Sequence, residues 1–128
     1  MKRWTIVGLQ VLLGLAFLAS AILKLAGAAD TMREHLEIAP WFWVLTALVE
    51  IVGVAGMFAG IKFPRLAVPA GLWIAALMGG GLVAHLRVGD PFTSMVPAAV
   101  YLVLALAVAT LRANAYEFKE RAGANLDQ

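Results

Sequence analysis

The feature that most constrains this chain is the spacing of its charged residues, which leaves four long stretches almost free of charge. Residues 4–23, 38–61, 66–86 and 91–111 form these stretches, of 20, 24, 21 and 21 residues, and Glu50 is the one charge inside them. An α-helix needs about 20 apolar residues to cross a hydrocarbon layer about 30 Å thick. The pattern therefore predicts an all-α integral membrane protein with four spans.

The composition supports a membrane environment. Hydrophobic residues make up 62% of the chain and charged residues 14%, whereas a soluble domain has about 45–50% and roughly 25%. Membrane strands are excluded, because they are about 10 residues long and alternate apolar with polar residues. The chain contains no cysteine, which excludes disulfides, thiolate metal sites and thiol-based redox chemistry.

The expected arrangement is one domain, a four-helix bundle with antiparallel neighbours. The spans are predicted at about residues 4–26, 40–61, 66–87 and 91–112, followed by a polar tail over 113–128. Short connections between consecutive helices favour antiparallel packing. The first apolar run also resembles a secretory signal, but signal regions are usually 7–15 residues long, so we expect a retained helix.

The longest connection precedes the second predicted span. Residues 31–34 read Thr-Met-Arg-Glu, the pattern of a capping box, and predict a short interfacial helix to about Ile38. Pro40 suits the first turn of the next helix. Trp41 and Trp43 are expected in the headgroup belt, where tryptophan is enriched.

Lysine and arginine favour one side of the predicted membrane. Seven would lie on the side of the termini, namely Lys2, Arg3, Lys62, Arg65, Arg112, Lys119 and Arg121. Three would lie on the other side, namely Lys24, Arg33 and Arg87. Cytoplasmic loops carry the excess of basic residues, so both termini are predicted to be cytoplasmic. The basic residues flank spans rather than cluster, so no nucleic acid partner is expected.

Glu50 is the first candidate for a functional residue. It is the thirteenth residue of its 24-residue stretch, near the bilayer midplane, where carboxylates usually face the bundle and often serve function. The alternative is a structural glutamate that fixes helix packing. Counting about 1.5 Å per residue, Tyr101 lies at the same depth and Trp73 within about one turn. This shared depth predicts a Glu50–Tyr101 hydrogen bond.

Polar residues also gather toward the side opposite the termini. Ser20 and Lys24 lie one helical turn apart on a stripe that carries most polar groups of the first span. With His85, Lys24 is predicted to form a small polar pocket above Glu50. The alternative is that Lys24 snorkels to the headgroups and His85 is an ordinary interfacial histidine. Asp90 precedes a proline and is expected to cap the last span.

Glycines predict where helices approach closely. Gly56 and Gly60 form a GxxxG pair, which permits tight helix packing in lipid. This face is expected to serve either the bundle itself or a homodimer. The triplet at residues 79–81 is also expected to serve packing, with a helix distortion and a ligand contact near the backbone as the alternatives.

No metal or nucleotide site is predicted. The two histidines, His35 and His85, are far apart in the sequence, and no ligand spacing supports a metal site. The chain has no phosphate-binding loop, dinucleotide fingerprint or nucleophile elbow. No cofactor is firmly implied by the residues alone.

Several short segments together resemble the DoxX-like family of small bacterial membrane proteins. They are residues 17–27 (FLASAILKLAG), residues 50–53 (EIVG), His85, residues 89–91 (GDP) and residues 97–98 (PA). The resemblance extends from about residue 4 to residue 111. It implies a four-helix bundle in the bacterial plasma membrane, beside a membrane oxidoreductase partner, with a quinone as candidate ligand. The recurrent positions of the family match Lys24, Glu50 and His85, and none of them has an agreed catalytic role.

Three functional hypotheses follow. The first is a non-enzymatic subunit or bundle that binds a lipophilic ligand such as a quinone or lipid. The second is a small proton-coupled transporter that works as a dimer and uses Glu50. The third is an enzyme on a lipid-soluble substrate, with Glu50 and His85 as acid and base. This hypothesis is the least favoured, because the two depths differ by about 13 Å.

Overall fold

The computed structural model describes residues 3–126, except for the side chains of residues 116–119 and 124–126. Its helices are α1 (Arg3–Leu25), α2 (Asp30–His35), α3 (Pro40–Lys62), α4 (Pro64–Arg87) and α5 (Phe92–Leu126). No strand occurs within residues 3–126. In that part of the chain, α1, α3, α4 and α5 are long and apolar enough to cross a membrane. The all-α four-span prediction is confirmed, whereas Lys2 and the side chain of Lys119 lie outside the described residues.

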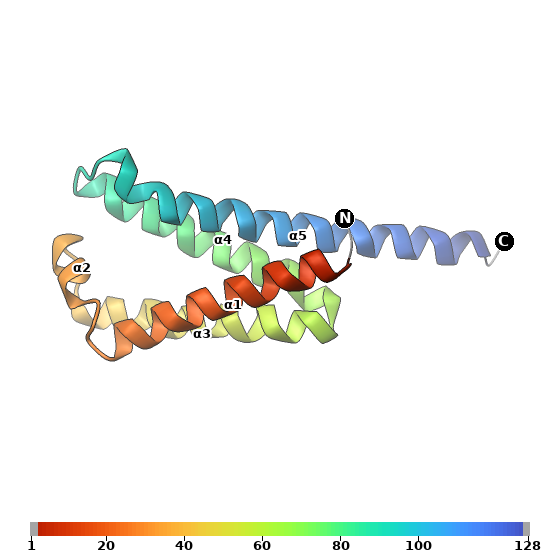
Figure 1. Ribbon diagram of the computed structural model, residues 1–128, viewed down its shortest axis with the longest axis horizontal. Coiled ribbons are helices and arrows are strands. Elements are labelled where there is room, and N and C mark those ends of the chain that lie inside the picture. Colours follow the sequence, from red (N-terminus) through yellow and green to blue (C-terminus); the bar gives the residue numbers. More distant parts are fainter. Residues whose placement is uncertain (1–2, 127–128) are drawn as a thin grey trace.

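Two helix pairs build the bundle. Helix α1 lies against α3 and α4 against α5, and the two pairs diverge toward the end that carries α2 (Figure 1). We call this the α2 end. Helix α1 begins at the opposite end, near the turn between α3 and α4, and α5 extends beyond that end, which we call the termini end (Figure 1). Consecutive spans run antiparallel, as short connections predict.

Small residues close the bundle near the termini end. A Cβ atom added to Gly60 would lie 2.8 Å from Ala67, and one added to Gly56 would lie 3.1 Å from Ala70. Gly71 is similarly tight, since an added Cβ would lie 2.8 Å from the carbonyl oxygen of Ala105. The Gly56/Gly60 face therefore packs on α4 inside the bundle, which is one of the two roles that the sequence left open for it.

The outer surface of the bundle is apolar, as a bilayer requires. Exposed large side chains on the four long helices include Leu12, Leu15, Leu48, Val52, Leu72, Val103 and Leu106. The buried core includes Leu13, Met57, Ile74 and Val108. Because lipid tails are as apolar as these residues, close packing and polar contacts between helices hold the bundle together rather than a difference in hydrophobicity.

A set of hydrogen bonds around Gln10 in the core was not predicted. The Gln10 side-chain amide donates to the carbonyl oxygen of Met57 at 3.1 Å, and Gln10 Oε1 accepts from Arg112 Nε at 2.8 Å and Nη2 at 2.5 Å. Arg112 is 6% exposed. The sequence placed it at the membrane surface as a topology signal, but it also joins α5 to α1 and α3 near the termini end.

Three helices end at the α2 end in the same way. The residue after each helix cap has a left-handed backbone, with φ of 79° at Gly27, 55° at Glu37 and 74° at Gly89. Paired backbone hydrogen bonds close each end, for example Asp90 N–H to the His85 carbonyl at 3.1 Å. This is the Schellman motif. Glycine is the usual residue at its left-handed position, because glycine lacks a Cβ. Glu37 adopts it without that advantage.

The predicted bounds of α2 and the predicted start of α5 are wrong in detail. Helix α2 begins at Asp30, with Ala29 at the cap position and no side-chain cap bond, so Thr31 does not start a capping box. It also ends before Ile38, because the left-handed turn at Glu37 stops it. Helix α5 begins at Phe92. The carboxylate of Asp90 holds two histidines instead of capping that helix.

Candidate functional site

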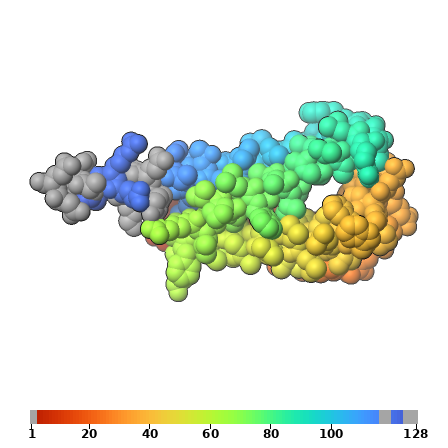
Figure 2. Space-filling model, turned by 180° about the vertical axis from the view of Figure 1, so that it is seen from behind, coloured from red at the N-terminus to blue at the C-terminus, as the bar shows by residue number. Residues whose placement is uncertain are grey.

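A cavity of about 470 Å³ lies between the diverging helix pairs and is covered by α2. Figure 2 shows the molecule hollowed there, with an opening between α4 and the segment formed by α2 and α3. All five helices contribute to the mostly apolar lining. The polar residues of the lining are Ser20, Lys24, Thr46, Glu50, His85, Ser94 and Tyr101.

An ion pair is buried in the cavity wall. The Lys24 ammonium lies 3.3 Å from Glu50 Oε1, and the Ser20 hydroxyl donates to the same oxygen at 3.2 Å. Ser20 and Lys24 are one turn apart on α1, so both side chains reach the same point on α3. Glu50 is 2% exposed, and within the described residues its Oε2 has no hydrogen-bond partner. The site therefore combines two opposite charges with one unsatisfied acceptor.

Trp43 completes the surroundings of Lys24. The ammonium lies 4.5 Å from the centroid of the Trp43 ring, within the range of a cation–π contact. Trp43 is 5% exposed, so its prediction as a headgroup-belt residue is wrong, whereas Trp41 is 71% exposed. The Trp43 indole N–H has no hydrogen-bond partner among the described residues. Lys24 lies in the bundle between this ring and Glu50 and does not snorkel.

Tyr101 lines the same cavity but does not pair with Glu50. Its ring packs edge-on against Phe17 with 5.4 Å between centroids. Glu50 Oε1 is held by Lys24 and Ser20, while Oε2 is unpaired within residues 3–126. The predicted Glu50–Tyr101 hydrogen bond is wrong, because equal depth does not make two side chains face each other.

Trp73 lies outside the cavity lining. Its indole N–H donates to the carbonyl oxygen of Val49 at 2.9 Å, and its ring covers Gly53, where an added Cβ would lie 3.0 Å from Trp73 Cδ1. Half-exposed on the α3–α4 face, Trp73 serves helix contact rather than the cavity. Of the seven candidate residues from the sequence, it is the one that the structure places away from the others.

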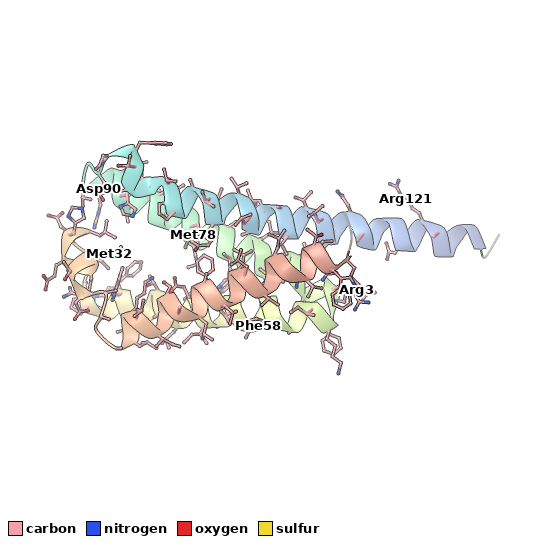
Figure 3. The ribbon with its side chains drawn as sticks, viewed as in Figure 1. Arg3, Met32, Phe58, Met78, Asp90 and Arg121 are labelled. Carbon is pink, nitrogen blue, oxygen red and sulfur yellow. The ribbon has the colours of Figure 1, made fainter. Side chains whose placement is uncertain are left out.

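Two histidines share the carboxylate of Asp90 above the cavity. His85 Nδ1 lies 2.6 Å from Asp90 Oδ2, and His35 Nε2 lies 2.5 Å from Asp90 Oδ1. Figure 3 places Asp90 at the tip between α4 and α5, facing α2. The hydrogen bonds from His85 and then His35 hold the pKa of Asp90 below its usual value. Among the side chains that the structure describes, no group of three or more acidic or histidine residues forms a metal-binding arrangement.

Arginines hold the segment that follows α2. Arg87 Nη2 donates to the carbonyl oxygens of Leu36 and, at 3.1 Å, Glu37. Arg33 Nη1 donates to the carbonyl oxygen of Ile38 at 3.1 Å. The Arg87 bonds and the His35–Asp90 contact tie this region to the end of α4 and the turn after it, and the Arg33 bond holds Ile38 close to α2. Met32, Leu36 and Ile38 are then held as the cover of the cavity.

The glycine triplet on α4 does not mediate tight packing, so that prediction is wrong. A Cβ added to Gly80 or Gly81 would meet no atom within 4 Å, and one added to Gly79 would meet only Leu102, at 4.0 Å. Gly80 and Gly81 line the cavity. Because Gly80 and Gly81 have no side chains, they leave open part of the cavity that larger residues would fill. The alternative of a ligand contact near the backbone agrees with this geometry.

Five sequence candidates therefore meet at one cavity, namely Ser20, Lys24, Glu50, His85 and Tyr101. Asp90 adjoins them through His85. Trp43, Thr46 and Arg87 were not predicted from the sequence as residues of the site. Trp43, Thr46 and Glu50 follow helical three-and-four spacing on α3, a signal that could have placed the first two on the face of Glu50. No such spacing pattern in the sequence marks Arg87.

One of the comparisons with known proteins identifies a family. The model of the DoxX-like family matches residues 8–108. The uncharacterized protein YdgD of Bacillus subtilis is 27% identical over 103 residues, which cover 78% of this chain and 90% of that protein. No solved structure matches the chain. The family match runs from within α1 to about the middle of α5 and includes every polar residue of the cavity lining, so the chain belongs to the DoxX-like family.

Proposed function

We propose that this protein is a non-enzymatic membrane subunit that binds a lipophilic molecule in the cavity under α2. The cavity carries the proposal, because its volume of about 470 Å³ lies within the roughly 300–1,000 Å³ of small-molecule sites. Its walls are mostly apolar and contain a few convergent polar groups. Apolar walls accommodate a hydrocarbon body, and the polar groups orient one polar head.

A binding role fits the state of the polar groups. His85 Nδ1 is held by Asp90, and Glu50 Oε1 is held by Lys24 and Ser20. Groups fixed by neighbours in this way suit recognition, since their geometry does not depend on the ligand. An acid–base enzyme would instead require a base in reach of the proton that it abstracts.

A quinone is the candidate ligand that the family resemblance suggests, and a membrane oxidoreductase is the matching partner. The fit rests on the residues of the cavity. Tyr101 and Lys24 carry hydrogen-bond donors in the lining, beside Ser20, whose hydroxyl donates to Glu50, and quinone carbonyls are acceptors. The apolar lining suits a prenyl tail. A bound quinone would supply reversible two-electron chemistry to the partner, while this chain would hold and orient it.

We also propose that the termini end is cytoplasmic and that the membrane is the bacterial plasma membrane. Described basic residues at the termini end are Arg3, Lys62, Arg65, Arg112 and Arg121, and those at the α2 end are Lys24, Arg33 and Arg87. This imbalance supports the orientation by the positive-inside rule. The match to a Bacillus protein supports the bacterial membrane.

Native mass spectrometry after gentle release from native membranes tests the proposal. We expect one defined small-molecule mass on the unaltered protein, and its loss in Lys24→Ala and Glu50→Gln. A protein that carries only a statistical distribution of lipids would contradict a specific ligand. Proton-coupled transport through Glu50 would appear instead as uptake into proteoliposomes driven by a pH gradient and abolished by Glu50→Gln.

A further inference from the structure

The Glu50 carboxylate has one oxygen that the protein leaves unsatisfied. Glu50 lines the cavity and is 2% exposed, yet Oε2 has no hydrogen-bond partner among the described residues. A buried polar atom without a partner is unfavourable by about 1–3 kcal/mol, and more when it is charged. Because Glu50 lines the cavity, a ligand bound there lies beside this carboxylate. A ligand that donates a hydrogen bond would satisfy it.

The charges of the cavity exclude a charged head. Lys24 and Glu50 form an ion pair, and His85 is held by the Asp90 carboxylate. An anionic head would approach the Glu50 carboxylate, and a cationic head would compete with Lys24 for it. Each would add an uncompensated charge to an apolar cavity, which is strongly unfavourable. A neutral head with a hydroxyl group meets neither obstacle.

The depth and the opening of the cavity indicate where such a ligand comes from. Glu50 lies near the middle of α3 (Pro40–Lys62), far from the level of phospholipid headgroups. The opening beside α4 in Figure 2 lies on the side of the bundle, where the helices are apolar enough to face lipid. Gly80 is exposed and lines the cavity, so the wall is thin there. A neutral lipophilic molecule dissolved in the bilayer can reach the site sideways.

We infer that the ligand is an uncharged lipophilic alcohol or phenol, whose hydroxyl group donates a hydrogen bond to Glu50 and whose apolar body enters from the bilayer. This inference rests on the proposed function and narrows its ligand class. For a quinone-type ligand it means that the hydroxyl-bearing reduced form binds more tightly than the oxidised form. The oxidised form has no donor for the carboxylate.

A matched pair of probes tests the hydroxyl group directly. The full chain in lipid nanodiscs is titrated with 4-dodecylphenol and with its methyl ether, 4-dodecylanisole, and bound probe is counted by native mass spectrometry. We expect the phenol to bind at least about tenfold more tightly, as a hydrogen bond to a charged group permits. In Glu50→Gln the preference should fall to less than about threefold. Equal binding of both probes to the unaltered protein, or binding of neither, would overturn the inference.

Two glycine variants separate this inference from the proposed function. Gly81→Leu fills the cavity, whereas Gly8→Leu adds the same side chain at an exposed position of α1 where an added Cβ meets no atom within 4 Å. We expect the first to lose both probes and the second to retain the phenol preference. If Gly81→Leu removes both probes but the unaltered protein does not distinguish them, the cavity binds ligands and the hydroxyl inference fails alone. If Gly81→Leu binds the phenol as well as the unaltered protein does, phenol binding lies outside the cavity and the inference fails.

Discussion

The Lys24 ammonium and the Glu50 carboxylate lie 3.3 Å apart inside the bundle, with the side chains 15% and 3% exposed. Lys24 comes from the last turn of α1 and Glu50 from the middle of α3. The long lysine side chain reaches inward along the cavity wall to meet the glutamate. This pair links the packing of α1 on α3 to the polar chemistry of the cavity.

Breaking this pair should destabilise the bundle more than removing both charges. Lys24→Met leaves Glu50 buried without its counter-charge, and loss of one partner of a buried pair lowers the free energy of unfolding by about 3–5 kcal/mol. Lys24→Met with Glu50→Gln should be closer to the unaltered protein. Thermal unfolding in a mild detergent measures both, with Lys62→Met as the control at an exposed end. A double variant less stable than Lys24→Met would contradict the pairing.

Acid should loosen the cover of the cavity. The pKa of Asp90 is lowered by hydrogen bonds from His85 and His35. A carboxyl group with a lowered folded pKa contributes stability that is present above its usual pKa of about 3.9. That stability is lost as the pH falls through the lower folded value. The protection of residues 30–38 from hydrogen exchange, measured relative to the intrinsic exchange rate at each pH, should therefore fall below about pH 4.

Asp90→Asn provides the matched variant for the acid effect. It keeps the size of the side chain but removes its titration, so α2 should exchange faster at neutral pH, with less further change on acidification. The exchange of residues 53–60 in the packed part of α3 serves as the internal control. Equal acid sensitivity of α2 in Asp90→Asn and the unaltered protein would show that another group controls the cover.

Glu37→Gly should stabilise the turn after α2. Glu37 has φ of 55°, and a left-handed backbone is unfavourable by roughly 1–2 kcal/mol for a residue with a Cβ. Glycine removes this penalty, although it also gains freedom in the unfolded chain. We expect slower hydrogen exchange in residues 33–38, because Arg87 bonds to the Glu37 backbone oxygen and not to its side chain. Gly89→Ala, at φ of 74°, should have the opposite effect on its own turn.

The glycines of α3 and α4 should respond differently to alanine. At Gly60 an added Cβ would lie 2.8 Å from the Ala67 backbone, so Gly60→Ala should separate the two helices and lower the unfolding temperature. At Gly80 it would meet nothing within 4 Å, and alanine is a better helix former by about 1 kcal/mol. Gly80→Ala should therefore be neutral or stabilising. Comparable destabilisation by both variants would contradict the distinction between a packed and an open glycine.

The spans and the polar candidates Lys24, Glu50 and His85 could be predicted because both follow mainly from depth in the membrane. Uncharged stretches of bilayer length define the helices, and position along them placed Lys24, Glu50 and His85 in the bundle. Depth does not fix how each helix is rotated about its axis. Tyr101 therefore lies at the predicted level without bonding to Glu50, and Trp73 lies outside the cavity.

Other features depended on contacts that no local pattern encodes. Glycines occur both where helices touch and where a wall must stay thin, so the triplet at residues 79–81 could not be assigned from its composition. Asp90 followed by proline is typical of a helix start, but two histidines from separate segments take its carboxylate. The burial of Arg112 similarly depends on Gln10, which is distant in sequence.

The most direct test of the central claim is a comparison of Gly81→Leu with Gly8→Leu by native mass spectrometry after release from native membranes. Gly81 lines the cavity, whereas Gly8 is exposed on α1, and both have room for a side chain. We predict that Gly8→Leu retains the same defined ligand mass as the unaltered protein and that Gly81→Leu loses it. An identical ligand mass on both variants would contradict a ligand site in the cavity.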